Sequence, residues 1–399
     1  MIYVFEDTCH TQLNPLAMTR PVMAIRSGRS TFLERIESFT EGAEICLVVR
    51  PEMERITREL YPEMTVNPTT FQDGFWLKAA VFWDSSLLKR IFASQTLFLH
   101  ADRLMAGYLP AAVATDWMAK GGPLSGVIPP GPSETCPVPD VEYLWEIQPR
   151  AEAELKDMEI NNPVVKREGV TVIHPDQVDI SGSATLLPQI VIDASDGPVI
   201  LEENVTIHPF SYIQGPTVIG RGSTVTAHTR ITKSFIGPGC KVGGEISSTI
   251  FQGWSNKVHY GFIGNSFIGE WVNLGAGTTG SNLKNNYSTV TVRVNNTPVN
   301  TGEQFIGAFI GDHVKSAIGT RFNTGTVIEP GCNLVDQAFL PKWIPAFTWL
   351  QNGNLSTYDW EKFLVTAEAG MQRRKQHLTA AQQQLLHEIR GRRTSRIIV

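Results

Sequence analysis

The chain has 399 residues, of which 42% are hydrophobic and 18% are charged. This composition predicts a folded protein with an ample core, and the length predicts two or three domains. The 39 acidic and 34 basic residues give a formal charge of −5, which argues against a nucleic-acid groove or binding to an anionic membrane.

No apolar run approaches the ~20 residues that a membrane helix needs, and the opening residues lack the pattern of a signal peptide. The cysteines are odd in number and scattered, which favours a reducing, cytoplasmic environment over a disulfide framework or a zinc site. They are Cys9, Cys46, Cys136, Cys240 and Cys332.

The first hundred residues alternate between apolar runs and helical segments. Apolar runs predict buried strands at residues 2–5, 44–49 and 96–100. A helix is predicted after Ser30, with Glu34 close to the capping-box position, and another after Pro51. The alternation predicts a Rossmann-like α/β domain, in which ligands bind beyond the carboxyl ends of the strands.

The following segment, residues 106–165, contains several Gly and Pro clusters and predicts irregular structure that ends in a short helix from about residue 150 to 158. We therefore expect an α/β domain over residues 1–165. A second domain is expected over residues 166–350, and a helical cap over residues 351–399.

The loop after the first strand reads PLAMTRP from Pro15 to Pro21 and resembles the opening of sugar-nucleotide pyrophosphorylases. The resemblance implies transfer of a nucleotidyl group from a nucleoside triphosphate to a sugar 1-phosphate, with Arg20 binding substrate and Asp102 binding Mg²⁺. That family has a glycine-rich phosphate loop, whereas here no glycine precedes Gly28. An active domain and a degenerate one both remain open.

The second half of the chain has a six-residue period. Aliphatic residues stand at Leu201, Ile207, Ile213, Ile219, Val225 and Ile231. After a slip of one residue, the period returns at Ile236, Val242, Ile268, Leu274, Ile310, Phe322, Ile328 and Leu334. Glycine often follows the aliphatic residue, as sharp corners between flat sides require. The pattern predicts a parallel β-helix, and it resembles the left-handed hexapeptide acyltransferases, which usually form trimers.

The segment from Gln252 to Tyr287 contains the residue types that acyl transfer requires. His259 is followed 14 residues later by Asn273 and then by Gly275-Ala276-Gly277. The segment resembles the acetyltransferase half of the bifunctional bacterial enzymes that make UDP-N-acetylglucosamine. The resemblance implies that His259 is the catalytic base, that Asn273 contacts substrate, and that the acetyl-CoA arm passes Gly275 and Ala276.

The stretches QGWSNKVH, GEWVNLGAGT and LKNNY resemble more closely still an alternative bacterial form of that enzyme, a UDP-N-acetylglucosamine diphosphorylase/glucosamine-1-phosphate N-acetyltransferase. Ser247 stands where the standard acetyltransferase has a lysine for the sugar phosphate. Five basic residues are therefore candidates for binding that phosphate: Lys257, Arg230, Lys284, Lys315 and Arg321. His313 is a second site candidate, with a structural role equally open.

Two further elements are expected near the end of the chain. Residues 288–299 predict a hairpin that turns at Asn295-Asn296. Helices are expected from about Asp359 and after Thr379, and they would cap the open end of the β-helix.

Three functions are compatible with these patterns. The first is acetyl transfer to an amino-sugar phosphate, with nucleotidyl transfer in the first domain. The second is a nucleotidyltransferase whose β-helix only forms the trimer. The third is a sugar-nucleotide-binding protein without catalysis, since the glycine-rich phosphate loop is missing.

Overall fold

The computed structural model describes residues 1–40, 42–158, 160, 168–336 and 338–397. Contacts divide the chain into two compact units. The first unit contains residues 1–13, 20–143 and 380–385, and the second contains residues 14–19, 144–379 and 386–399. The domain boundary expected near residue 165 lies outside the described residues.

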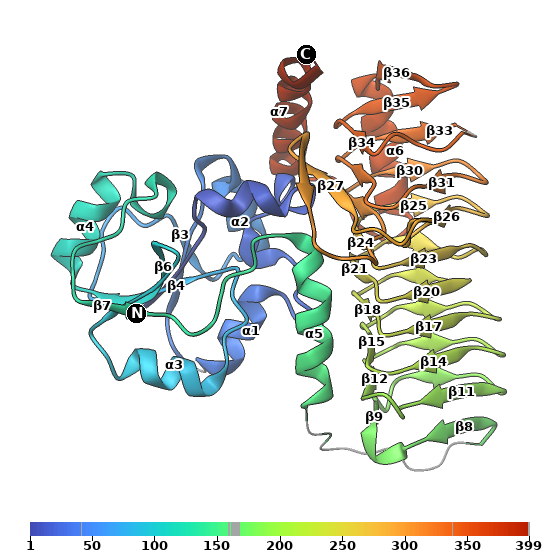
Figure 1. Ribbon diagram of the computed structural model, residues 1–399, viewed down its shortest axis with the longest axis horizontal. Coiled ribbons are helices and arrows are strands. Elements are labelled where there is room, and N and C mark those ends of the chain that lie inside the picture. Colours follow the sequence, from blue (N-terminus) through green and yellow to red (C-terminus); the bar gives the residue numbers. More distant parts are fainter. Residues whose placement is uncertain (41, 159, 161–167, 337, 398–399) are drawn as a thin grey trace. The chain divides into compact units, whose positions relative to one another are not determined.

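The first unit is built on a seven-stranded sheet with the order β3-β2-β1-β4-β6-β5-β7. Its strands are β1 (Ile2–Phe5), β2 (Ile45–Val48), β3 (Thr65–Val66), β4 (Gly74–Lys78), β5 (Leu97–His100), β6 (Arg103–Leu109) and β7 (Ser133–Thr135). Its helices are α1 (Phe32–Phe39), α2 (Glu54–Leu60), α3 (Ser85–Phe92) and α4 (Ala111–Ala119). They flank the sheet (Figure 1). Strand β6 runs antiparallel to both of its neighbours, and the other pairings are parallel.

The three predicted strands of this unit are confirmed as β1, β2 and β5. Helix α1 begins after Thr31, whose side chain accepts a hydrogen bond from the Glu34 backbone N–H while the Glu34 carboxylate accepts one from the Thr31 N–H. This is the expected capping box, with Thr31 rather than Ser30 at the N-cap.

The expectation of irregular structure from residue 106 onward is wrong over its first part. Strand β6 continues to Leu109, and helix α4 starts directly after Pro110. A proline is favourable at the start of a helix because its missing N–H would have no partner there. Gly107 has a different role: a Cβ there would collide with Leu97 of β5, so glycine permits the close pairing of the two strands.

The second unit contains a parallel β-helix with three flat faces. The ten-stranded face contains β10 (Thr185–Leu186), β13 (Thr206–Ile207), β16 (Thr224–Val225), β19 (Lys241–Val242), β22 (Asn256–Lys257), β25 (Asn273–Leu274), β30 (Lys315–Ser316), β33 (Asn333–Val335), β35 (Thr348–Gln351) and β36 (Asn354–Thr357). The six-stranded face contains β8 (Val170–Ile173), β11 (Ile190–Asp193), β14 (Tyr212–Gln214), β17 (Arg230–Thr232), β20 (Glu245–Ser247) and β23 (Phe262–Gly264). The nine-stranded face contains β9 (Val178–Ile180), β12 (Val199–Leu201), β15 (Thr217–Ile219), β18 (Phe235–Ile236), β21 (Ile250–Gly253), β24 (Phe267–Glu270), β29 (Phe309–Ile310), β32 (Val327–Ile328) and β34 (Trp343–Ile344). The short pair β26 (Thr279–Gly280) and β31 (Arg321–Phe322) is also parallel.

The interior of the β-helix is a single hydrophobic column. The six aliphatic residues of the first run, from Leu201 to Ile231, are at most 1% exposed, and those of the later runs are also buried. The coils are stacked along the β-helix (Figure 1). Each coil adds one such residue per face, in register with the equivalent residue of the coil before it. The six-residue period therefore predicted the interior correctly.

Helices and a hairpin complete this unit. Helix α5 (Ile147–Lys156) precedes the β-helix, and α6 (Trp360–Gln372) and α7 (Ala380–Ile397) follow it. Helix α6 starts at the expected Asp359, whose carboxylate caps the Lys362 N–H. The predicted hairpin is formed by β27 (Thr291–Val294) and β28 (Thr297–Asn300), with positive φ at both Asn295 and Asn296.

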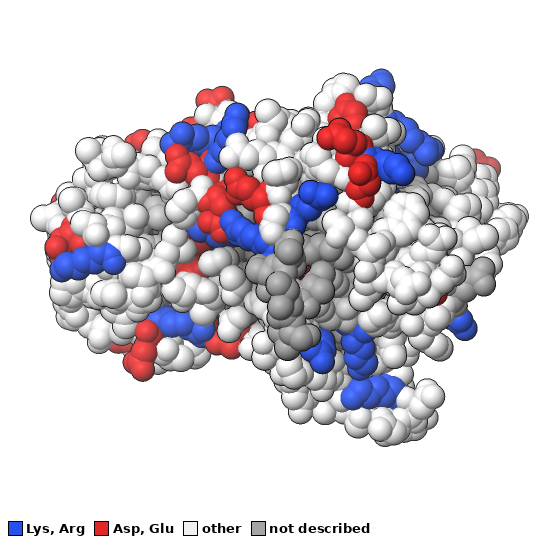
Figure 2. Space-filling model, turned by 90° about the horizontal axis from the view of Figure 1, so that it is seen from above, with Lys and Arg blue, Asp and Glu red and all other residues white. Residues whose placement is uncertain are grey.

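None of the described helices has both the length and the apolarity needed to cross a membrane. On the face shown in Figure 2, acidic and basic side chains are intermingled, and wide areas have neither.

Candidate active sites

His259 lies at an exposed corner of the β-helix, between β22 and β23. The next coil is offset by 17 residues: Asn256 pairs with Asn273 before the corner, and the Phe262 N–H donates to Thr279 Oγ1 after it. The same offset places His259 beside Ala276. The 14 residues from His259 to Asn273 are three fewer than one turn of the coil, so Ala276 rather than Asn273 lies next to His259.

Asn273 and the following glycine also belong to this corner region. The Asn256 Nδ2 group donates a hydrogen bond of 2.7 Å to Asn273 Oδ1, which fixes the orientation of the exposed Asn273 amide. At Gly275 a Cβ would come within 2.6 Å of the Ala317 backbone, so only glycine fits. His259, Asn273, Gly275 and Ala276 therefore lie on two consecutive coils.

Lys257 is buried, whereas a lysine that binds substrate phosphate was expected on the surface. Its side chain points into the β-helix, where it is 2% exposed and occupies an aliphatic position of the repeat opposite Val242. The Nζ atom donates to the carbonyl oxygens of Gly243 (2.9 Å), His259 (3.0 Å) and Gly261 (2.8 Å). Burial lowers the pKa of Lys257 to about 8. Lys257 is therefore an internal brace for the corner that contains His259.

Arg230 lies on the outer surface of the six-stranded face. Its guanidinium is paired with Glu245 at 3.0 Å, and both side chains are about half exposed. Glu245 in turn is paired in register with Phe262, the first residue of the strand after the His259 corner. Arg230 thus lies on the six-stranded face, whose last strand, β23, follows the His259 corner. A phosphate bound by Arg230 would compete with Glu245 for the guanidinium.

His313 is a packing residue. It is 6% exposed, and its ring meets Phe363 of α6 edge-on at 5.8 Å between centroids. These contacts support a structural role for His313 over a role in a site.

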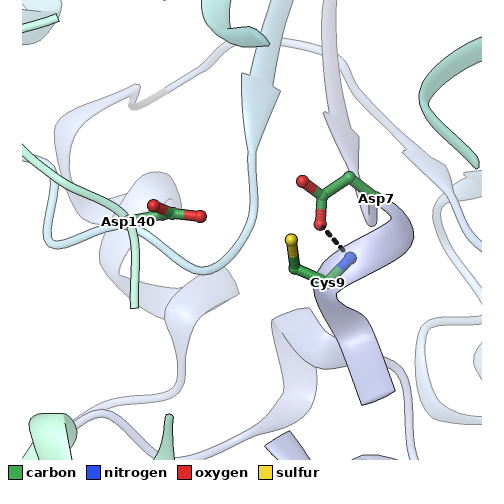
Figure 3. Close-up of side chains that lie close together, drawn as sticks. All are labelled: Asp7, Cys9 and Asp140. Carbon is green, nitrogen blue, oxygen red and sulfur yellow. Dashed lines mark hydrogen bonds between the residues drawn. The ribbon is translucent and has the colours of Figure 1, made fainter. Parts of the chain in front are cut away.

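The first unit holds a compact group of ionisable side chains at the carboxyl ends of its strands. Ligand atoms of Asp7, Cys9 and Asp140 lie within 4.8 Å of one another, and the side chains converge on one space (Figure 3). Lys78, the last residue of β4, contacts the carboxylates of Asp7 and Asp140, each at 2.5 Å. Arg103 binds Asp140 at 2.9 Å as well. The position follows the rule for parallel sheets, although none of these residues was predicted.

These side chains do not fit a magnesium site. Lys78 already pairs with both carboxylates and Arg103 with Asp140, and a metal ion would have to displace the Lys78 ammonium. Asp102, the expected ligand, is exposed in the tight turn between β5 and β6, where it has positive φ, and it belongs to no metal-ligating group among the described residues. The open space beside the cluster is about 10 Å³, roughly one water.

The loop that contains Arg20 is held by a buried ion pair. Glu6 accepts hydrogen bonds from the Val22 N–H and from the Arg50 Nη1 group, at 2.5 and 2.6 Å. Arg50 also donates to the Arg20 carbonyl oxygen. Arg20 itself is 5% exposed, so any contact with substrate requires this loop to move.

Two family models match parts of the chain. Residues 2–157 match the family model for sugar nucleotidyl transferases, and residues 198–233 match that for bacterial transferase hexapeptide repeats. The chain therefore contains both domain types, and the hexapeptide match covers part of the β-helix described above.

Curated relatives have the same two-part character. A bifunctional sugar-1-phosphate nucleotidylyltransferase/acetyltransferase of Sulfurisphaera tokodaii is 33% identical over 33% of this chain and 34% of its own. The bifunctional protein GlmU of Carboxydothermus hydrogenoformans is 26% identical over 43% of this chain and 40% of its own. The matches span less than half of these relatives. Among solved structures, an Arabidopsis UDP-N-acetylglucosamine acyltransferase covers 53% of this chain and 77% of its own, at 12% identity and a TM-score of 0.23.

Proposed function

We propose that the β-helix transfers an acetyl group from acetyl-CoA to the amine of an amino-sugar phosphate, with glucosamine 1-phosphate as the acceptor. The proposal is supported above all by the alignment of His259 with Gly275-Ala276 on consecutive coils. The Sulfurisphaera tokodaii relative, whose name combines nucleotidyl and acetyl transfer, also supports it.

The reaction requires a neutral amine and a polarised thioester. His259 accepts the proton of the substrate ammonium, since an imidazole can take a proton near neutral pH. The amine then attacks the thioester carbonyl carbon, a C–N bond forms and the C–S bond breaks. Coenzyme A leaves as its thiol with the proton held by His259, and the second proton of the amine passes to water as the amide forms. Asn273 orients the sugar, and the Gly275-Ala276 backbone lets the donor arm lie close.

The experiment is release of free thiol from acetyl-CoA, followed with glucosamine 1-phosphate as acceptor. Replacing His259 by alanine should lower kcat by about 10²–10⁴, the usual contribution of a general base. His228→Ala is the matched control, because His228 is an exposed corner histidine on the same edge, stacked on Phe210. Full activity in His259→Ala would refute the assignment of the base.

Nucleotidyl transfer in the first domain is the second candidate, supported by the family match over residues 2–157. Lys78 and Arg103 would supply positive charge at the strand ends, and the loop containing Arg20 would open to admit a nucleoside triphosphate. Pyrophosphate release with a sugar 1-phosphate tests this activity separately. Release of pyrophosphate without acetyl transfer would favour the β-helix as a scaffold, and ligand binding without either activity would favour a non-catalytic protein.

A trimer completes the proposal. Flat β-helix faces that one chain leaves exposed can be covered by neighbouring copies, and a closed ring leaves no unpaired surface. Light scattering of the full chain measures this directly, with three times 44.1 kDa as the expected mass.

A further inference from the structure

A cavity of about 460 Å³ lies between the ten-stranded face of the β-helix and the C-terminal part of α6. Its floor contains the outward-facing ladder of Lys241, Asn256, Asn273 and Lys315, which pair in register on consecutive strands. Its volume is in the range of small-molecule sites.

One wall of the cavity is aromatic. Trp254 and Trp271 stand at successive corners, and their rings are stacked at 5.5 Å with an interplanar angle of 11°. Both have positive φ, 52° and 58°, a backbone conformation that is costly for a bulky residue. Other coils have Gly239, His313, Gly331 or Phe347 at the equivalent corner, also with positive φ. The tryptophan pair is the part of this row of corners that borders the cavity.

The opposite wall explains why the space is open. Near the start of α6, Phe363 packs against the corner rings of His313 and Phe347 and fills the space between the helix and the β-helix. Near the end of the helix, α6 instead presents Ala369 and Gly370 to the cavity. A Cβ at Gly370 would have nothing within 4 Å. The helix therefore leaves the tryptophan pair uncovered.

The cavity is strongly cationic. Lys241, Lys315, Arg373 and Arg374 are among its twelve lining residues, and none of the twelve is acidic. The two less exposed cations are held by carbonyl oxygens: Lys315 donates to Trp271 O and Arg374 to Gly239 O. Burial lowers the pKa of Lys315 to about 8 and also lowers the pKa of Arg374. Bringing cations together in this way is unfavourable unless an anion joins them.

We propose that this cavity binds the nucleoside diphosphate group of a nucleotide ligand. The base would stack on the tryptophan pair, which is how aromatic walls hold bases of any sequence. The diphosphate would lie against Lys241, Lys315 and Arg373, with the arginine able to grip two oxygens. A simple anion would leave the aromatic wall without a role, and an apolar ligand would leave the four cations uncompensated.

Two ligands of the proposed chemistry contain this group: coenzyme A, through its ADP portion, and a uridine diphosphate sugar. Nucleotide binding here does not require His259 to be a catalytic base. The full chain is titrated with ADP, UDP, coenzyme A and UDP-N-acetylglucosamine, and the quenching of tryptophan fluorescence is recorded beside calorimetry. Pyrophosphate, which has the diphosphate but no base, is titrated as well, and the difference between its affinity and that of ADP gives the contribution of the nucleoside.

Gly370→Leu is the decisive variant, since the added side chain enters the open space and leucine favours helix more than glycine does. We expect it to weaken nucleoside diphosphate binding by at least about tenfold, or about 1.4 kcal/mol. Gly370→Ala is the matched control, with the same gain in helix propensity and an open cavity. Lys241→Gln should weaken binding by roughly threefold to tenfold and reduce its salt dependence.

Each outcome decides the matter. Tighter binding of coenzyme A than of UDP-N-acetylglucosamine would identify the cavity as part of the donor site, and the reverse order would identify a site for the product nucleotide. Equal binding to wild type and Gly370→Leu, equal affinity for pyrophosphate and ADP, or no binding at millimolar ligand would overturn the proposal. Unchanged ADP binding in His259→Ala with lost acetyl transfer would separate the two sites.

Discussion

Replacing Lys257 by methionine removes the ammonium group inside the β-helix and keeps most of the side-chain volume. The change tests whether Lys257 is a brace for the His259 corner, as its three carbonyl contacts indicate. A phosphate-binding lysine would affect substrate affinity and leave stability unchanged. A brace would affect stability first.

The expected size follows from two opposing terms. Burial of the charge lowers the pKa from 10.5 to about 8, which corresponds to roughly 3 kcal/mol that methionine recovers. Methionine also leaves three carbonyl groups without this donor, at about 1–3 kcal/mol for each buried group. The second term is larger, so at pH 7 we expect Lys257→Met to lower the free energy of unfolding by about 3 kcal/mol.

The pH dependence gives an independent signature. Between pH 8 and 10.5 the unfolded lysine remains protonated while the folded one has lost its proton, so the stability of the wild type rises with pH in this window. The variant lacks this contribution. The stability difference between wild type and Lys257→Met should therefore be about 2 kcal/mol larger at pH 9.5 than at pH 7.

Urea unfolding followed by circular dichroism measures both quantities, with wild type and variant compared at each pH so that other titrating groups cancel. Thiol release from acetyl-CoA in the same variant should show a lower kcat with little change in KM for the sugar phosphate, since the corner is displaced and no substrate contact is lost. A stability difference that stays constant with pH, or a variant as stable as wild type with a raised KM, would refute the brace.

The remaining predictions concern backbone packing and the acidic cluster of the first unit. Gly237→Ala should prevent correct coiling, because its Cβ would collide with the backbone of Phe251 and Gln252; Gly182→Ala, where nothing lies within 4 Å, should fold normally by circular dichroism. Lys78→Met leaves Asp7 and Asp140 close together without the ammonium that joins them, and we expect a loss of about 3–5 kcal/mol in urea unfolding. Added Mg²⁺ should raise the Tm of Lys78→Met and leave that of wild type unchanged, and equal shifts in both proteins would contradict the displacement of a metal by Lys78.

The β-helix was predictable because each face needs one buried aliphatic residue per coil, and this need recurs every six residues along the chain. The same period could have placed Lys257 correctly: Phe251, Lys257 and Ile263 are six residues apart, and the outer two are fully buried. The sequence interpretation treated this lysine as a surface charge because lysine is rarely buried. At this position the six-residue period is therefore a better guide to burial than the usual surface location of lysine.

The cluster in the first unit could not be predicted in this way. Lys78 and Asp140 are 62 residues apart, and their pairing depends on the sheet order, in which β4 lies between β1 and β6. No periodic pattern relates such residues. The cavity over Trp254 and Trp271 was missed for the same reason, since its second wall is a helix about one hundred residues further along the chain.

The two ionic sites differ in one physical respect that bears on what they bind. In the first unit, Lys78 pairs with Asp7 and Asp140, and Arg103 pairs with Asp140 and Glu142, so both cations already have carboxylate partners. In the β-helix cavity, four cations share a space whose twelve lining residues include no acid. Binding of a further ion to paired charges is unfavourable, because the ion must break existing pairs. Cations without an acidic partner among the lining residues are instead stabilised by a bound anion. Of the two, the β-helix cavity is therefore the site where an anionic nucleotide should bind without rearrangement, and a nucleoside diphosphate should raise the Tm of the β-helix before it affects the first unit.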